Sequence, residues 1–159
     1  MTIDYLADRR EFVPTLAEWL HREWGHLRAG STVADRIGWI ERSSGHGEIP
    51  TAFVAAAGDQ VLGCAMLIEQ DMSTRPELSP WLAGVYVSRE HRRRGIGAAL
   101  IERVVGEARS LGEQRLYLYT PGPGTLYSRL GWSVVERTVY PPLWGEQEIT
   151  IMELSTNAP

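Results

Sequence analysis

The 159-residue sequence contains no lysine, so all 16 of its basic side chains are arginine. This absence excludes the Walker phosphate-binding loop, in which a lysine reaches the phosphates of a bound nucleotide. Cysteine is almost absent as well, and the single Cys64 excludes an internal disulfide, as is typical of a cytoplasmic protein. Because Cys64 lies within an apolar run, we expect a buried, inert thiol rather than a nucleophile.

Long apolar segments are also missing. No hydrophobic run has membrane-spanning length and no signal-peptide pattern follows Met1, so we expect a cytoplasmic protein that does not bind a membrane. The histidines show no metal-ligand spacing, so we expect no metal site. The formal net charge of -4 argues against a nucleic-acid partner. The length and the ordinary hydrophobic content of 43% predict a single domain over residues 1–159.

The most informative stretch extends from residue 82 to residue 112. It begins with Val85-Tyr86-Val87, whose β-branched and aromatic side chains are typical of a buried strand. It ends with apolar residues at helical spacing up to Gly112, which predicts a helix with one buried face. The segment between strand and helix is rich in arginine and glycine and consists of Arg92, Arg93, Arg94, Gly95, Ile96 and Gly97.

This segment has the chemistry of a diphosphate-binding turn. Glycine lets the backbone approach a ligand and point its N–H groups toward one place. The helix N-terminus contributes a partial positive charge, and the arginines contribute full charges that do not titrate near neutral pH. The same residues also fit a tight strand-to-helix turn with a solvated cluster of charges, so the turn alone leaves both interpretations open.

Together with Ala98, the turn resembles the acetyl-CoA signature of the GNAT superfamily of N-acetyltransferases, (Q/R)-x-x-G-x-(G/A) directly after a V-x-V strand. A second segment, L-Y-S-R-L-G-W at residues 126–132, resembles the L-Y-x-x-x-G-(F/W/Y) segment of that family. The two matches occur in the family's order. The resemblance is specific from residue 82 to residue 132, and outside that window only the order of elements agrees.

Hydrophobic periodicity predicts about seven strands and four helices. The expected strands are residues 2–6, 51–57, 61–70, 82–87, 115–120, 134–139 and 148–154. The expected helices are residues 11–28, one capped by Ser31 or Thr32, the one that ends at Gly112, and 125–130, with a turn at 140–147. The resemblance implies an α/β fold, in which helices flank both faces of a strongly twisted mixed sheet. It also implies that parallel strands 82–87 and 115–120 splay apart, so that the pantetheine arm of acetyl-CoA can pair with the free main-chain groups.

The resemblance implies acetyl-CoA as cosubstrate and a reaction without a covalent enzyme intermediate. Tyr127 would donate a proton to the departing thiolate, since a phenol is protonated at neutral pH; alternatively, Tyr127 packs beneath Trp132 as a core residue. The main-chain N–H of Val85 would stabilise the oxyanion, and Arg92 would brace the turn or reach a phosphate. The implied cofactor-binding residues are Val85, Tyr86, Val87, Arg92, Arg93, Arg94, Gly95, Ile96, Gly97 and Ala98.

The sequence departs from the family pattern at three places. Ser88 replaces a frequent proline, and residues 121–124 replace a segment that usually carries asparagine. Trp81 occupies the place where some members have a carboxylate, so the general base is unidentified. Each candidate base is also explicable as an ordinary surface or sheet residue; the candidates are Glu23, Glu69, Asp71 and Tyr119.

The acceptor-binding residues are expected in the variable segments 19–39, 69–81 and 140–147. Their tryptophans either form an aromatic wall that could hold a cation or fill the core; they are Trp24, Trp39, Trp81 and Trp144. The segment L-Y-L-Y-T-P before the second motif resembles members that acetylate peptide N-termini, while similar layouts handle polyamines, antibiotics and amino acids. The acceptor is therefore a small-molecule or peptide amine. Related proteins often dimerise, and the sequence leaves a homodimer open.

Three hypotheses follow. The leading one is an N-acetyltransferase that moves an acetyl group from acetyl-CoA to a primary amine by direct attack in a ternary complex. The alternative is a non-catalytic CoA-binding sensor or scaffold domain, which the missing base and the altered 121–124 segment favour. A nucleic-acid binder that uses the arginines at 89–94 is disfavoured by the negative net charge.

Overall fold

The computed structural model describes residues 1–159. The strands are β1 (Thr2–Tyr5), β2 (Thr51–Ala57), β3 (Gln60–Ile68), β4 (Trp81–Val87), β5 (Arg115–Pro121), β6 (Ser133–Tyr140) and β7 (Gly145–Ser155). The α-helices are α1 (Val13–Trp24), α2 (Val33–Arg42), α3 (Ile96–Ser110), α4 (Thr125–Arg129) and α5 (Pro141–Trp144). Short 3₁₀ turns cover Leu6–Asp8, Arg10–Phe12, Gly25–Leu27 and Arg89–His91.

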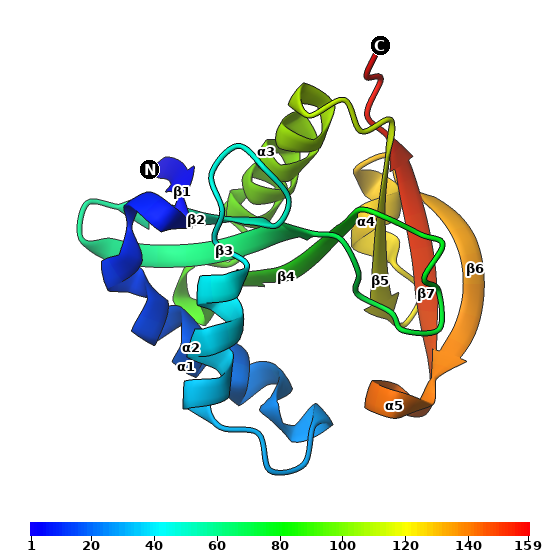
Figure 1. The fold of residues 1–159 in the computed structure, drawn as a ribbon, viewed down its shortest axis with the longest axis horizontal. Helices are drawn as coiled ribbons and strands as arrows, with labels where there is room; N and C mark the ends of the chain where they lie inside the picture. The colour runs from blue at the N-terminus through cyan, green and yellow to red at the C-terminus, as the bar shows by residue number, and fades with distance from the viewer.

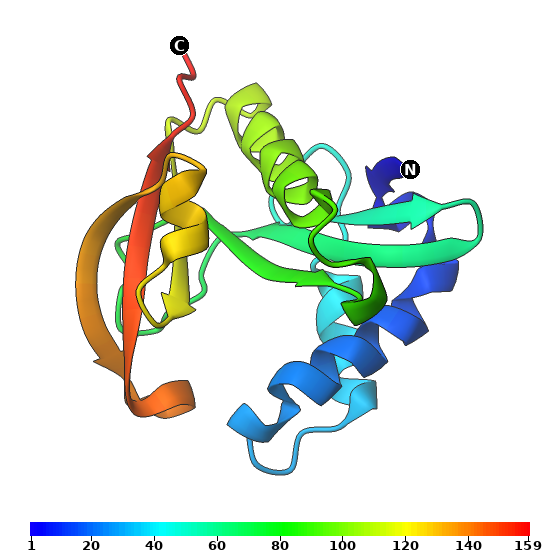
Figure 2. The ribbon, with the colours of Figure 1, turned by 180° about the vertical axis from the view of Figure 1, so that it is seen from behind.

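All seven strands belong to one sheet, in the order β1-β2-β3-β4-β5-β7-β6 (Figure 1). Every neighbouring pair is antiparallel except β4 and β5, which are parallel. Helices α1 and α2 cover one face of the β1–β4 half, and α3 covers the other face (Figure 2). The expected mixed α/β sheet with helices on both faces is confirmed.

The sheet separates two hydrophobic clusters, and β2 contributes to both. Its residues alternate, with Val54 packing in the cluster of α1 and α2 and Phe53 in the cluster of α3. Alternation with period two places successive side chains on opposite faces of a strand. Because both faces are covered, nearly the whole strand is apolar and buried.

Strands β4 and β5 diverge soon after they meet. Their only paired residues are Trp81 and Tyr117, so the following β4 residues have no strand partner on the β5 side. On its other side, β4 shifts register against β3 between Cys64 and Met66, opposite Gly84. Gly84 has a φ of 60°, in the left-handed region that glycine adopts without strain. Such a bulge bends and twists its strand, and the expected splay of the two central strands is confirmed.

The structure corrects the element boundaries in the more irregular segments. The expected helix at 11–28 is a shorter helix, α1, flanked by two 3₁₀ turns, and the expected turn at 140–147 contains α5 and the start of β7. The five α-helices include α5, which has only four residues. The cap of α2 is Thr32, whose hydroxyl accepts from the Asp35 N–H while the Asp35 carboxylate accepts from the Thr32 N–H. Ser31 instead donates its hydroxyl to the Gly25 carbonyl oxygen.

Candidate functional site

The turn between β4 and α3 adopts a backbone conformation that depends on glycine. Gly95 has a φ of 81° and directly precedes the first residue of α3, Ile96. The neighbouring Arg93 also has a positive φ, 65°, which is uncommon for a residue with a side chain. The N–H groups of Ile96, Gly97 and Ala98 belong to the first turn of α3, where no intrahelical acceptor exists. The turn therefore offers several main-chain donors at the positive end of a 15-residue helix.

Of the three consecutive arginines, Arg92 has a structural partner. Its Nε donates to the Val87 carbonyl oxygen at 2.9 Å, and its guanidinium lies 5.3 Å from the centre of the Tyr86 ring. Arg93 and Arg94 are exposed and form no ion pair. The geometry fits Arg92 as the brace of the turn, and it leaves the charges of Arg93 and Arg94 free for a ligand.

Tyr86 and Ser88 also support this turn. The Tyr86 side chain is 6% exposed and packs against Trp19 and Trp24, so only its main chain is accessible to a ligand beside β4. Ser88, which stands where proline is frequent in the resembling family, shares a 2.7 Å hydrogen bond with Nδ1 of His91. The serine thus ties the end of β4 to the following 3₁₀ turn.

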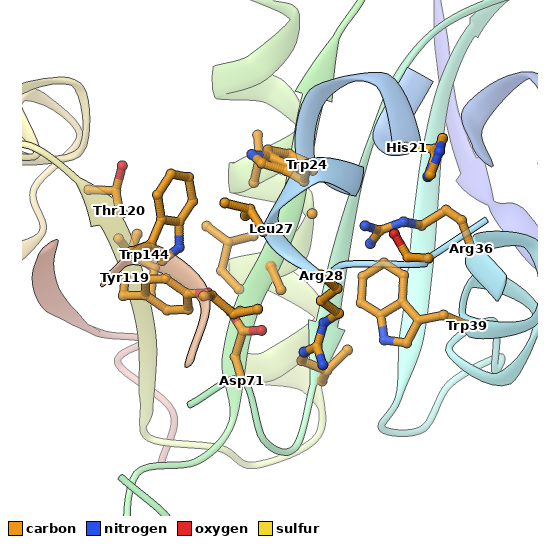
Figure 3. A pocket seen from close by; sticks show the side chains of 18 of the residues that line it. His21, Trp24, Leu27, Arg28, Arg36, Trp39, Asp71, Tyr119, Thr120 and Trp144 are labelled. Atoms are coloured by element: carbon orange, nitrogen blue, oxygen red, sulfur yellow. The ribbon is translucent and has the colours of Figure 1, made fainter. Parts of the chain in front are cut away.

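A cavity of about 510 Å³ lies at the place where β4 and β5 diverge. It reaches from the β4 bulge, with Gly84 and Val85, to side chains of α1, α2, β5, α4 and α5 (Figure 3). Such a volume suits a small ligand. The labelled side chains that line it are His21, Trp24, Leu27, Arg28, Arg36, Trp39, Asp71, Tyr119, Thr120 and Trp144, and Tyr127 lines it as well.

Tyr127 combines the two roles between which the sequence left a choice. Its ring packs edge-on against Trp132, with 6.3 Å between the ring centres, and the same residue lines the cavity together with Val85. Burial raises the pKa of the Tyr127 phenol above its ordinary value of 10.0. The hydroxyl therefore carries its proton throughout the neutral range.

Two of the four candidate bases lie in the cavity. Asp71 and Tyr119 line it, whereas Glu23 and Glu69 do not. Burial raises the pKa of Asp71 to about 7, although the nearby charge of Arg28 opposes this shift. The pKa of Tyr119 is raised by burial and by the charge of Asp71, so this phenol stays protonated. Asp71 is thus the cavity carboxylate that exchanges a proton near neutral pH.

The four tryptophans of the expected acceptor region divide between cavity and core. Trp24, Trp39 and Trp144 line the cavity. Trp81 is 0% exposed and donates its indole N–H to the Leu78 carbonyl oxygen at 2.6 Å, so of the two alternatives it takes the core position. The guanidinium of Arg36 lies 5.2 Å from the centre of the Trp39 ring, so this ring already has a cation beside it.

Three arginines of the cavity were not identified from the sequence: Arg28, Arg36 and Arg42. Arg28 and Arg36 lie within the segment 19–39 that was expected to bind the acceptor, but arginine on a surface helix carries no signal that separates it from a solvated residue. Only the packing of α1 against α2 brings these side chains together. Across the whole chain, no three His, Cys, Asp or Glu side chains are grouped so that they could hold a metal ion, and none of the helices has the length and hydropathy to cross a membrane.

Comparison with known proteins agrees with this geometry. The sequence profile of the Acetyltransferase (GNAT) family matches residues 13–132. An aminoglycoside 6'-N-acetyltransferase in complex with coenzyme A has a similar structure, with a TM-score of 0.78, 18% identity and coverage of 98% of this chain and 97% of that chain. The structure of yncA from Salmonella typhimurium with acetyl-CoA has a TM-score of 0.75 and 20% identity, with coverage of 99% of this chain and 95% of that chain. The ribosomal-protein-alanine N-acetyltransferase from Brucella melitensis has a TM-score of 0.72 and 20% identity, with coverage of 98% of this chain and 99% of that chain. No curated protein sequence matches the chain significantly.

The parted central strands, the glycine turn at the head of α3 and the profile match together define an acetyl-CoA-dependent N-acetyltransferase. The chain belongs to the GNAT acetyltransferase family, whose profile spans three quarters of its length, residues 13–132 of 159.

Proposed function

We propose that this protein transfers the acetyl group of acetyl-CoA to a primary amine by direct attack within a ternary complex. The observation that carries the proposal is one cavity that joins the β4 bulge at Val85, the protonated phenol of Tyr127 and the carboxylate of Asp71. These three groups supply an N–H donor, an acid and a base, which are the functions that acyl transfer to an amine requires.

The residues around the turn fit a molecule with a diphosphate and an amide-containing arm. Arg93, Arg94 and the main-chain N–H groups from Gly95 to Ala98 would hold the diphosphate, while Arg92 keeps the turn in place. The β4 main chain from Val85 to Val87 has no strand partner on the β5 side and would pair there with the amides of the arm, Tyr86 taking part through its backbone alone. Acetyl-CoA supplies the thioester whose acetyl group is transferred.

Each reacting proton has a group of suitable pKa. Asp71, with a pKa of about 7, is the base that removes a proton from the amine. The Val85 N–H is the proposed donor to the oxyanion, beside the β4 bulge. Tyr127 keeps its proton at neutral pH and is the proposed acid for the thiolate. The separation of a base from an acid in one cavity allows both proton transfers at the same pH.

The state of Cys64 supports direct attack over an acyl-enzyme route. Its side chain is 0% exposed, and burial raises the pKa of the thiol to about 12. A thiol in that state is neither accessible nor ionised, so it is a poor nucleophile. This thiol therefore does not compete with the acceptor amine for the thioester.

The acceptor is a small-molecule or peptide amine, and the size of the cavity favours a small molecule or a single chain terminus. Two proteins of similar fold are aminoglycoside 6'-acetyltransferases, and another is a ribosomal-protein-alanine N-acetyltransferase. A homodimer remains an expectation from the family resemblance, which sedimentation velocity would measure.

Thiol release from acetyl-CoA in the presence of a panel of amines tests the proposal. We expect amine-dependent release and initial-rate plots that intersect when both substrates are varied, as a ternary complex requires. Parallel plots would show an acyl-enzyme instead. Calorimetric binding of acetyl-CoA without turnover of any amine would support the sensor alternative, and the absence of acetyl-CoA binding at millimolar concentration would refute both.

A further inference from the structure

The acceptor side of the cavity is lined by three guanidinium groups. Arg28 follows the 3₁₀ turn at the end of α1, and Arg36 and Arg42 are on α2. In Figure 3, Arg36 and Trp39 lie on the opposite side of the cavity from Tyr119 and Trp144, and Arg28 lies between the two sides. Burial lowers the pKa of Arg36, and the nearby charge of Arg28 lowers it further.

None of these three arginines has an anionic partner in the protein. No carboxylate lies within 4.0 Å of their guanidinium nitrogens, whereas Arg9, Arg75, Arg103 and Arg115 each form an ion pair elsewhere in the molecule. Arg75 even binds both oxygens of Glu136. Arg36 is half-buried, whereas Arg28 and Arg42 are exposed. A half-buried positive charge without a counter-ion is unfavourable, so the place of Arg36 in the cavity wall provides a site for an anion.

The negative groups of the cavity do not balance this charge. Its acidic lining residues are Asp35 and Asp71. The Asp35 carboxylate is engaged by the Thr32 N–H in the cap of α2. Asp71, whose pKa is raised to about 7, is only partly ionised at neutral pH, and in Figure 3 it lies between Tyr119 and Arg28. The wall of α1 and α2 therefore presents an excess of positive charge, with the faces of Trp24 and Trp39 beside it.

On the basis of the proposed function, we infer that the acceptor is an anionic amine: a small molecule whose primary amine and whose carboxylate or phosphate are separated by an apolar body. The amine lies toward Asp71, the anionic group binds Arg28 and Arg36, and the apolar body contacts the tryptophans. Guanidinium groups bind both kinds of anion with two parallel hydrogen bonds. The same charges repel polycations, so an aminoglycoside is a poor acceptor for this chain.

Matched acceptors test this inference. The pair para-aminomethylbenzoate and para-aminomethylbenzamide differs only in charge at the far end, and phosphoethanolamine with ethanolamine forms the phosphate pair. We expect kcat/KM to be about tenfold to hundredfold higher for the anionic member of at least one pair, since a charge-assisted hydrogen bond is worth that much. The pair with the larger difference in kcat/KM shows whether the site binds a carboxylate or a phosphate. The aminoglycoside kanamycin should react more slowly than every anionic acceptor.

Variants then locate the anion. Arg36→Gln and Arg28→Gln should lose the preference for the anionic member of the pair, and Arg36→Lys should retain part of this preference. Arg22→Gln is the matched control, because Arg22 is an exposed arginine of α1 that does not line the cavity. Unchanged acetyl-CoA affinity in all variants, measured by calorimetry, separates the acceptor from the cofactor site.

Two results would overturn the inference. One is equal or faster turnover of the neutral member in both pairs by the unaltered protein. The other is a preference that survives intact in both Arg28→Gln and Arg36→Gln, provided that their melting temperatures show folded proteins. Either result leaves the proposed acetyl transfer standing, whereas a complete lack of turnover with any amine refutes the proposed function itself.

Discussion

Replacement of Asp71 by asparagine should remove the pH dependence of the reaction. Burial raises the pKa of this carboxyl from 3.8 to about 7, so it is about one-tenth ionised at pH 6 and about nine-tenths ionised at pH 8. As the base, Asp71 must be ionised to accept a proton. We therefore expect kcat/KM of the unaltered protein to rise nearly tenfold across this interval, after correction for the protonation of the amine itself.

In the Asp71→Asn variant, we expect kcat to fall by about 10² to 10⁴, the usual contribution of a positioned base, and the step near pH 7 to vanish. Glu69→Gln is the matched control, since Glu69 is a nearby exposed carboxylate that does not line the cavity. The assay is thiol release under saturating acetyl-CoA between pH 5.5 and about pH 8.5, a range that covers about one and a half units on either side of the expected pKa.

The same substitution should stabilise the fold, and the sign follows from linkage. Between the unfolded pKa of 3.8 and the folded pKa of about 7, the native state binds more protons than the unfolded state, so the stability of the unaltered protein falls as pH rises through this interval. A shift of about three units corresponds to at most about 4 kcal/mol, and the partial exposure of the side chain reduces it to about 1–2 kcal/mol.

Asp71→Asn should therefore melt at a higher temperature than the unaltered protein at pH 8 and at nearly the same temperature at pH 4. The combination of lost activity and gained stability is typical of a functional group whose burial lowers the free energy of unfolding. If the variant keeps its full rate and the step near pH 7, Asp71 is not the base. If the variant melts at a lower temperature than the unaltered protein at pH 8, the Asp71 carboxylate stabilises the fold, and folding does not raise its pKa.

Three further substitutions test other parts of the site. Tyr127→Phe should bind acetyl-CoA normally and reduce kcat by about 10² or more at neutral pH, because the phenol is the proposed acid; an unchanged rate at every pH would remove Tyr127 from that role. Gly95→Ala should weaken acetyl-CoA binding in calorimetry and lower stability by about 1 kcal/mol, since a side chain at a φ of 81° is strained; an unaltered affinity would contradict the role of the turn. Cys64→Ala should leave kcat within about twofold, as expected for a buried, protonated thiol, and a rate loss without a loss of stability would favour an acyl-enzyme.

The sequence predicted those parts of the fold that follow from local pattern. The composition of β2 and β4 placed both strands to within one residue, whereas α3 begins at Ile96, inside the segment that was expected to precede the helix. Local pattern was less informative where tertiary contacts decide. The segment around Pro141 contains proline and tryptophan in a short connection, and only its packing shows a helical turn followed by a long last strand.

The candidate site was predictable where a motif specifies it and not where packing does. The glycine turn and Tyr127 follow each other in a recognisable order, so both were identified as site residues from the sequence. Arg36 and Asp71 are 35 residues apart in the chain and belong to no motif, and they line one cavity only in the folded chain. The sequence therefore missed Arg36, and it named Asp71 only as one of four candidate bases that it could not rank. The sequence left the place of Trp81 open for the same reason, since its neighbours in space, not its neighbours in sequence, bury it.

The single pair of residues that joins β4 to β5 divides the sheet into two halves that carry different parts of the cavity. The half from β1 to β4 holds the arginine wall through α1 and α2, and the half from β5 to β7 holds Tyr119, Tyr127 and Trp144. The angle between the two halves therefore determines the distance between the arginines and the reaction centre, and with it the length of acceptor that fits. Trp81 packs against Tyr117 and Tyr119 at that junction. A smaller side chain at position 81 would change the preferred acceptor length without touching the acceptor.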